Sequence, residues 1–282
     1  LLKNEKNLLP IDKQKYKRIL VTGPNADNQS ILGDWTFFQP DSNVTTILKG
    51  IRDIAPEVDV VYSNSGRIKA KVSREKTNTT DPALQKQLLI EGGGISDYSI
   101  SDAVTKARYC DLIVVVIGGY GIRSDWGLRT YGESADRPSI DFYGRQLELV
   151  RALQKTQKPV VAVIVNGKPL NNEWITENIP AIVDIWEPGG EVNPSGKLPI
   201  TIPKNVGQIP MYYYQSPSRY WTGYGLGSSR SDDYPAFCFG HGLSYTTFEY
   251  NNLKLDTIFS KNEDIQLSFN VKNTGKLAGK EI

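Results

Sequence analysis

Histidine, methionine and cysteine are nearly absent from this chain of 282 residues, which contains one His, one Met and two Cys. With His241 as the single histidine, neither a zinc site nor a histidine-based catalytic triad is expected. Any hydrolysis would therefore rest on carboxylates, and we expect no metal and no other cofactor. Cys110 and Cys238 lie far apart in the sequence, and we interpret them as buried free thiols rather than a disulfide.

Long apolar runs and an excess of charge are also missing. No run approaches the roughly 20 apolar residues that span a membrane. The chain has 33 basic and 31 acidic side chains, for a formal net charge of +2. Nothing in this balance favours nucleic acid or an anionic membrane as a partner, and we expect neither.

The two ends of the chain lack the usual start and targeting signals. The sequence begins at Leu1 without an initiator Met or a signal-peptide pattern, and it stops at Ile282 just after an alternating segment. We therefore expect it to be part of a longer polypeptide. Its length permits one large domain and a smaller piece.

Most of the sequence alternates between strand-like and helix-like segments. Short apolar runs with the composition of buried strands are separated by segments of helical period. The predicted strands are 18–23, 58–62, 112–117, 159–165 and 181–186, and the predicted helices are 45–54, 101–109 and 143–153, with 83–90 as a further candidate. Such alternation is typical of a mostly parallel sheet with helices on both faces. The predicted fold class is α/β, an α/β sandwich.

The pattern changes after Gly190. The next strand candidate, 197–202, follows too closely for a parallel crossover, which needs about a dozen residues or more. Either this strand is antiparallel or a crossover segment is missing. From Phe248 onward apolar residues alternate, at Leu253 and Leu255 and again within 265–271. This alternation predicts the start of an antiparallel β-sandwich.

The stretch 118–137 follows a predicted central strand and precedes a helix, so we place it as a long loop at the strand's carboxyl end. Open α/β sheets bind their ligands at that end. The loop holds glycines for tight turns, aromatic rings and charges of both signs, including Glu133. Its Gly119-Tyr120-Gly121 segment fails as a dinucleotide fingerprint, because Ser124 stands where the third glycine belongs.

Five motifs in the same order resemble those of glycoside hydrolase family 3, the group of β-glucosidases and β-xylosidases. They are Leu2-Lys3-Asn4-Glu5 with Leu8-Leu9-Pro10, Gly23-Pro24-Asn25-Ala26-Asp27, Asn166-Gly167-Lys168-Pro169-Leu170, Asn193-Pro194-Ser195-Gly196-Lys197-Leu198-Pro199 and Phe239-Gly240-His241-Gly242-Leu243-Ser244-Tyr245-Thr246-Thr247-Phe248. They extend over nearly the whole chain. The family's usual tyrosine is replaced by His241, which we interpret as a packing residue.

The resemblance implies an exo-acting β-glycosidase that hydrolyses terminal β-linked sugars with retention of configuration. In this family a (β/α)8-type barrel bearing the nucleophilic aspartate precedes an α/β sandwich and often a fibronectin-III-like module. By resemblance, residues 1–17 are a linker, 18–247 the α/β sandwich domain and 248–282 the incomplete start of a fibronectin-III-like domain. The implied partners are the barrel of the same polypeptide and a β-glucoside or oligosaccharide substrate, with a homodimer as a further candidate.

The resemblance also selects site residues. Retaining glycosidases need one carboxyl group as nucleophile and a second as acid and base, and the acid must keep its proton near neutral pH. Glu133 matches the family's acid/base position in its bacterial β-glucosidase branch, with Asp136 as the rival. Trp35 resembles a tryptophan of the leaving-group subsite, and Trp126 is a second substrate-binding candidate. The alternative for each tryptophan is packing. Without the barrel, the chain alone is expected to be inactive.

Other functions stay open. β-Xylosidase specificity is an alternative within the same family. A carbohydrate-binding or scaffolding module is the non-catalytic alternative. A nucleotide-binding domain is disfavoured because the sequence has no phosphate loop. The resemblance alone suggests a periplasmic or secreted protein.

Overall fold

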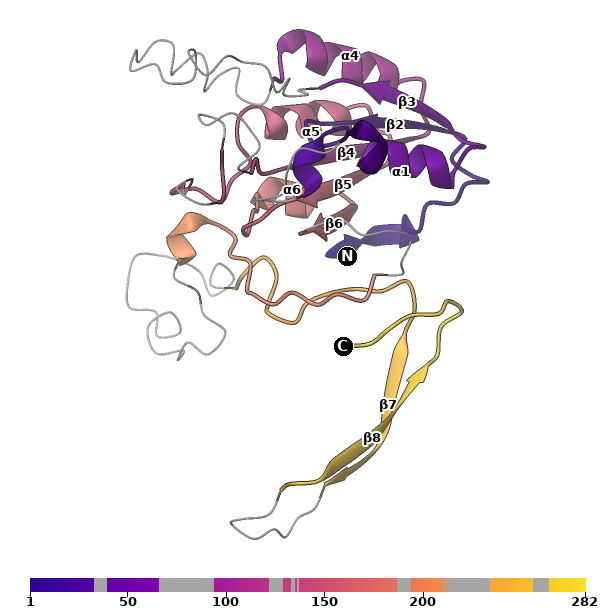
Figure 1. The fold of residues 1–282 in the computed structure, drawn as a ribbon, viewed down its shortest axis with the longest axis vertical. Coiled ribbons are helices and arrows are strands. Elements are labelled where there is room, and N and C mark those ends of the chain that lie inside the picture. The colour runs from indigo at the N-terminus through magenta and orange to yellow at the C-terminus, as the bar shows by residue number, and fades with distance from the viewer. Residues whose placement is uncertain are drawn as a thin grey trace.

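The structure is a computed structural model, and it describes residues 1–32, 40–65, 94–121, 129–132, 135, 137–186, 194–209, 211, 234–255 and 264–282. Six strands form one sheet in the order β1-β6-β5-β4-β2-β3 (Figure 1). The strands are β1 Lys3–Asn4, β2 Arg18–Thr22, β3 Asp59–Ser63, β4 Leu112–Gly118, β5 Val160–Val165 and β6 Ala181–Ile185. The five predicted strands are therefore confirmed, within a residue or two at their ends.

The strands from β2 to β6 are all parallel, and only β1 is antiparallel, pairing with β6. Residues 3–4 of the segment predicted as a linker thus form an edge strand. From β2 the chain moves outward to β3, and it then returns to place β4 on the other side of β2. The strand order reverses between β2 and β4, and parallel sheets form ligand crevices at the carboxyl ends of such a pair.

Helices cover both faces of the sheet (Figure 1). They are α1 Ile47–Ile54, α4 Asp97–Ala107, α5 Gln146–Gln154 and α6 Glu173–Asn178, with short 3-10 turns at Glu5–Asn7, Gln29–Leu32, Asp41–Asn43 and Val206–Gln208. Leu48 of α1 belongs to one buried cluster, whereas Ala103 of α4 and Leu149 of α5 belong to another. Because β4 alternates its side chains between the two clusters, the predicted α/β sandwich is confirmed.

Two helix predictions need correction. Helix α4 begins at Asp97 rather than at Ser101, because Ser96 caps it: the Ser96 hydroxyl accepts from the Ser99 N–H and Ser99 bonds back to the Ser96 backbone. Such a capping box satisfies two backbone donors at once. Helix α6 was not predicted; it has six residues, of which Ile175 is buried. The candidate helix at 83–90 lies outside the described residues.

The segment predicted as a strand at 197–202 forms no strand in the described part of the chain. A single antiparallel bridge joins Ile202 to Phe237, so the antiparallel alternative is closer to the observed structure. His241 packs here as predicted, with its ring 5.1 Å from that of Phe237 and Nε2 at 2.9 Å from the carbonyl oxygen of Leu2. Cys110 is buried as expected, but Cys238 is exposed, so the prediction of two buried thiols was wrong for Cys238.

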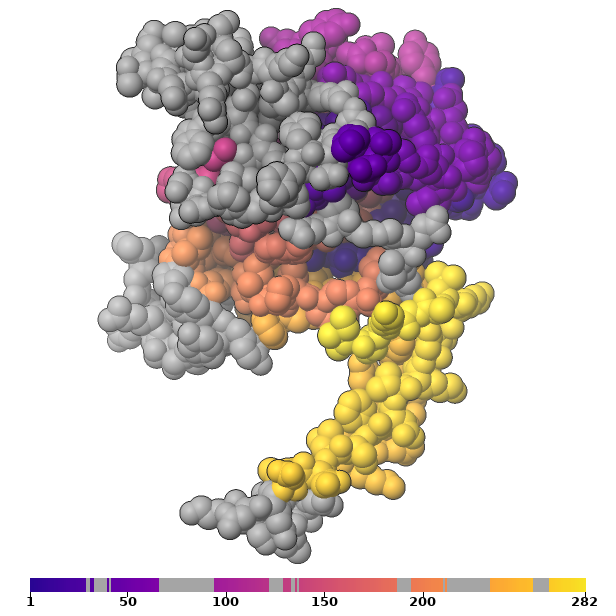
Figure 2. All heavy atoms as spheres, in the orientation of Figure 1, coloured from indigo at the N-terminus to yellow at the C-terminus, as the bar shows by residue number. Residues whose placement is uncertain are grey.

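Strands β7 Phe248–Leu255 and β8 Leu267–Asn273 pair antiparallel in a separate two-stranded sheet. The hairpin extends away from the α/β body as an arm (Figures 1 and 2). Its apolar side chains are mostly exposed, for example Tyr250 and Phe269, whose rings lie 5.9 Å apart. The predicted alternation is thus confirmed as an antiparallel pair, and no second layer covers it within the described residues.

Candidate active-site edge of the sheet

The predicted site residues themselves lie outside the described residues: Glu133, its rival Asp136, and both tryptophans, Trp35 and Trp126. The structure describes instead the chain on either side of the loop that contains Glu133. These flanks are 118–121 and 129–132, with Ala135 and 137 onward. Because they leave and rejoin the body at the end of β4, the loop belongs to the carboxyl edge of the sheet, as predicted from the sequence.

Two hydrogen bonds join the first flank to the second, between Tyr120 and Thr130. The Thr130 N–H donates to the Tyr120 carbonyl at 2.8 Å, and the Tyr120 N–H donates to Thr130 Oγ1 at 2.8 Å. Thr130 is 2 % exposed and Tyr120 is fully buried, so water does not compete for these bonds. Tyr120 and Thr130 are therefore fixed to each other by two buried hydrogen bonds.

Gln146, the first residue of α5, secures the strand from which the loop departs. Its side-chain amide donates to the Gly118 carbonyl at 2.9 Å, and its Oε1 accepts from the Gly118 N–H at 2.8 Å. The side chain is fully buried. It therefore satisfies both backbone groups of a glycine whose φ of +145° removes it from regular strand geometry. The sequence offered no signal for this contact.

Tyr131 lies between two glycines at the ends of neighbouring strands. A Cβ atom placed on Gly119 would come within 2.5 Å of the Tyr131 ring, and so would one on Gly167. Gly119 follows β4 and Gly167 follows β5, and the ring is 8 % exposed. The next residue, Gly132, has a φ of +97°, and its carbonyl accepts from the Ala135 N–H at 3.2 Å.

The second flank is held by stacking. The Arg137 guanidinium lies 4.3 Å from the centre of the Tyr143 ring, which in turn meets the Tyr120 ring edge-on at 6.3 Å. Burial raises the pKa of both phenols, and Arg137 lowers that of Tyr143 in part. Both hydroxyls therefore stay protonated, and neither finds a hydrogen-bond partner within the described structure.

Buried polar side chains gather along the same edge. Asn25, after β2, donates to the Gly119 carbonyl at 3.3 Å and so bridges the two strands where the order reverses. Asn166, after β5, donates to Asp184 Oδ1 of β6 at 3.0 Å. Oxygens of all three side chains, Asn25 Oδ1, Asn166 Oδ1 and Asp184 Oδ2, are inaccessible and have no partner among the described residues.

Asp184 has an unusual acidity. Burial raises its pKa to about 6, against smaller lowering effects from the hydrogen bonds of Asn166 and Trp186. The sequence held a signal here, since Asp184 is a lone charge within the apolar run 181–186. A buried carboxyl of this kind is either a structural burden or part of a site.

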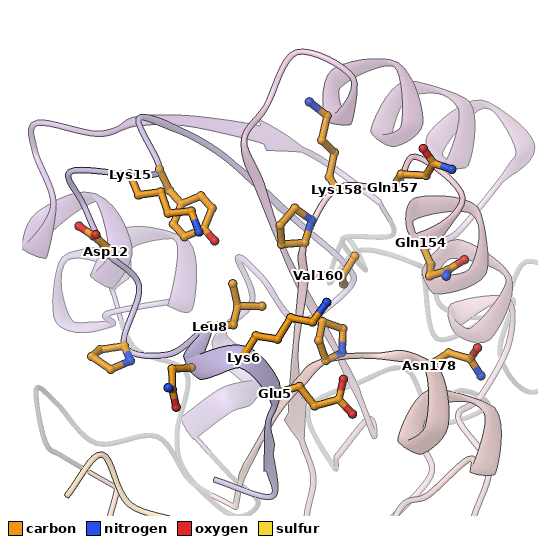
Figure 3. A pocket seen from close by; sticks show the side chains of 15 residues that line it. Glu5, Lys6, Leu8, Asp12, Lys15, Gln154, Gln157, Lys158, Val160 and Asn178 are labelled. Carbon is orange, nitrogen blue, oxygen red and sulfur yellow. The ribbon is translucent and has the colours of Figure 1, made fainter.

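The hollow in Figure 3 lies at the opposite edge. It measures about 650 Å³ and is bordered by the first residue of β5, Val160, and by Pro180 just before β6. Lys6, Lys15 and Lys158 reach its rim. Glu5 pairs with Lys3 at 3.0 Å and not with these three lysines in the described contacts. None of the loop flanks borders this hollow, so it is separate from the candidate site.

Neither a metal site nor a membrane span emerges from the described residues. No group of three or more His, Cys, Asp or Glu side chains is arranged to hold a metal ion there. Among the described helices, none is long and apolar enough to cross a membrane.

Similarity to known proteins agrees with this arrangement. The chain matches the model of the Glycosyl hydrolase family 3 C-terminal domain over residues 1–245. It is 37 % identical over 300 residues to the beta-xylosidase of Formosa agariphila, covering 100 % of this chain and 37 % of that protein. It is 30 % identical over 307 residues to the periplasmic beta-glucosidase of Salmonella typhimurium, covering 100 % of this chain and 38 % of the relative.

A solved structure shows the same fold. The β-glucosidase of Erythrobacter marinus superposes with a TM-score of 0.76 at 33 % sequence identity, over 99 % of this chain and 38 % of that one. The chain thus spans less than two fifths of the length of these relatives. A family match of this extent, together with a shared fold, identifies the chain as a member of glycosyl hydrolase family 3 that contains its C-terminal domain.

Proposed function

We propose that this chain supplies the general acid/base and part of the leaving-group subsite of a retaining β-glucosidase-like exo-glycosidase. Glu133 is the acid/base, Trp35 lies in the leaving-group subsite, and Trp126 contacts the substrate. The nucleophilic aspartate lies on a (β/α)8-type barrel of the same polypeptide, outside this chain. The observation that carries the proposal is the position of the loop flanks at the carboxyl ends of β4 and β5, beside the point where the strand order reverses.

The chemistry follows from what each carboxyl group must do. In the first step the barrel aspartate attacks the anomeric carbon while Glu133 protonates the departing oxygen. In the second step Glu133, now a carboxylate, takes a proton from water as the water attacks the glycosyl-enzyme. A glutamate serves both steps when its pKa lies near the working pH. Burial beside aromatic rings raises the pKa of a carboxyl group in this way.

The substrate class is a terminal β-linked sugar, as a β-glucoside or oligosaccharide. β-Xylosidase specificity is the second candidate, because the relative from Formosa agariphila with 37 % identity is a beta-xylosidase. Parallel assays of the full-length protein on aryl β-glucosides and aryl β-xylosides decide between them. A periplasmic location is proposed by analogy with the Salmonella typhimurium relative.

The test replaces Glu133 in the full-length protein and varies the leaving group. Glu133→Ala is expected to lower kcat/KM for 4-nitrophenyl β-glucoside by about 10²- to 10⁴-fold. The loss should be much smaller for 2,4-dinitrophenyl β-glucoside, whose leaving group departs without a proton. Azide should rescue turnover and yield a β-glucosyl azide, because it needs no general base.

Two controls assign the residue. Glu173→Ala removes an exposed glutamate from the first turn of α6 and should leave both substrates unaffected. Asp136→Ala tests the rival: if it, rather than Glu133→Ala, shows the dependence on leaving group, Asp136 is the acid. The isolated chain should hydrolyse nothing. Glucose binding by the isolated chain in calorimetry would favour the carbohydrate-binding module instead.

A further inference from the structure

The Tyr131 ring packs against two glycines, one at each edge of the ring, and we call the space that it occupies the slot. Its Cδ1 and Cε1 atoms face Gly119, and a Cβ there would lie 2.5 and 2.6 Å from them. Its Cδ2 and Cε2 atoms face Gly167, and a Cβ there would lie 2.5 Å from each. Real Cβ contacts are not this short, so neither position accepts a side chain while the ring stays in place.

The walls of the slot belong to rigid, adjacent strands. Gly118 and Val165, the last residues of β4 and β5, are paired in the sheet, and the Gly119 N–H donates to the Val165 carbonyl at 2.9 Å. Gly119 comes directly after β4, and Gly167 comes two residues after the end of β5. Neither glycine has a positive φ between +20° and +160°. Space, rather than backbone conformation, therefore requires glycine at both positions: space for the Tyr131 ring at Gly167, and at Gly119 space for the ring and for Thr130 Oγ1, which a Cβ would approach to 2.9 Å.

The slot fixes the chain on both sides of the ring. Before it, Thr130 is bonded to Tyr120; after it, the Gly132 carbonyl accepts from the Ala135 N–H. In the sequence, Glu133 is two residues beyond Tyr131. We propose that Tyr131, packed against Gly119 and Gly167, is a positioning residue. It fixes the position of the general acid, Glu133, in the active site shared with the barrel. This inference rests on the proposed role of Glu133.

The reason for such a device is the short range of proton transfer. A general acid must come within about 2.6–3.2 Å of the oxygen that it protonates. A displacement of about 1 Å can lower the rate by about 10²-fold. An acid carried on a loop, opposite a nucleophile on another domain, needs an anchor close to it in the chain. Tyr131 provides one that is tied to the middle of the sheet.

The experiment uses the full-length protein and a matched set of glycine variants. Gly167→Ala places a methyl group against one edge of the Tyr131 ring, and Gly119→Ala places one against the other edge. Gly196→Ala is the control, because no atom of the described residues lies within 4 Å of a Cβ placed on Gly196, and its φ lies outside the range from +20° to +160°. For each folded variant, kcat/KM is measured on 4-nitrophenyl and 2,4-dinitrophenyl β-glucosides, together with the Tm.

The expected result is a loss that depends on the leaving group. Gly167→Ala and Gly119→Ala should lower kcat/KM by about 10- to 100-fold for 4-nitrophenyl β-glucoside and by about 3-fold or less for the 2,4-dinitrophenyl substrate. Gly196→Ala should change neither. In a Tyr131→Ala background, Gly167→Ala should have no further effect, since the ring that it collides with is gone.

The outcomes separate this inference from the proposed function. If Glu133→Ala shows the dependence on leaving group but both slot variants lose activity equally on the two substrates, or lose none, the positioning role of Tyr131 is wrong and Glu133 stands. If Glu133→Ala itself shows no such dependence, the proposed acid is wrong and the role of Tyr131 falls with it. An effect of Gly167→Ala that persists unchanged in the Tyr131→Ala background also overturns the slot.

Discussion

At the carboxyl edge of the sheet the polar side chains are buried, whereas at the amino edge they lie in solvent. Along the carboxyl edge, Asn25, Gln146 and Asn166 are at most 1 % exposed. Asn25 Oδ1, Asn166 Oδ1 and Asp184 Oδ2 have no hydrogen-bond partner among the described residues. Along the amino edge, Arg18 pairs with Asp59 at 2.5 Å and Asp111 accepts from the backbone of Lys17 and Arg18, all at exposed positions.

The difference separates two uses of polar groups. Exposed ion pairs contribute little, because water solvates their members equally well when they are apart. Buried amides and carboxyls stabilise the fold only where each is bonded, as Gln146 is, so the oxygens at this edge that lack a described partner point to a use other than stability. The hollow of about 650 Å³ lies at the other edge. The described hollow and the buried polar side chains therefore lie at opposite ends of the same strands.

The largest difference in the free energy of unfolding is expected when glutamine is replaced by leucine at the first and at the last residue of α5. Gln146→Leu removes both partners of Gly118 and leaves its buried N–H and C=O unsatisfied. This should lower the free energy of unfolding by about 2–4 kcal/mol. Gln154→Leu, at the half-buried last residue of the same helix on the rim of the hollow, should change it by about 0.5 kcal/mol or less. Urea unfolding measures both, and equal effects would erase the contrast between the edges.

A smaller effect is expected at Asp184, and it should depend on pH. Its folded pKa of about 6 lies above the usual 3.8, so the folded state holds the proton more tightly than the unfolded state does. Stability from this group is therefore greatest below about pH 4, falls as pH rises to about 6 and is lowest above that. Asp184→Asn should then stabilise the fold by on the order of 1–2 kcal/mol at pH 8 and by little at pH 4.

The contrary outcome for Asp184 is also informative. The Asn variant keeps an oxygen that can accept from Asn166, but it places an NH₂ where Oδ2 has no described partner. That unpaired donor opposes part of the gain, which is why the expected value stays below the full linkage figure. Thermal unfolding at the two pH values provides the measurement. An equal change in Tm at both would mean that the pKa of Asp184 is not raised in the folded state.

The sequence predicted the sheet better than the helices. Each buried strand is a run of apolar residues, a signal that survives without any knowledge of its neighbours. Helix α6 gave no comparable signal, because it has six residues with a single buried side chain, Ile175. The start of α4 was misplaced since Ser96 and Ser101 look alike in sequence, and only the reciprocal bonds between Ser96 and Ser99 distinguish the true cap.

For the site, the sequence predicted its edge but not its supports. The loop after β4 is identifiable because a buried strand precedes it, whereas Glu133, Trp35 and Trp126 lie outside the described residues and stay predictions. The contact of Tyr131 with Gly119 and Gly167 joins positions 12 and 36 residues away along the chain. A contact between such distant segments follows from strand pairing and leaves no period in the sequence.

The smallest effect is expected from the ion pair at the amino edge. Lys3 and Glu5 lie 3.0 Å apart, with side-chain exposures of 17 % and 55 %. Glu5→Gln removes the charge but keeps the shape, and it should lower the free energy of unfolding by less than about 0.5 kcal/mol, with no difference from wild type at 1 M salt. Lys3→Met should have a larger effect, because the Lys3 ammonium also donates to the carbonyls of Thr176 and Glu177 near the end of α6. If Glu5→Gln instead lowered the free energy of unfolding as much as Gln146→Leu does, exposed ion pairs would stabilise this sheet as much as buried amides. The two edges would then not differ in how their polar groups contribute to stability.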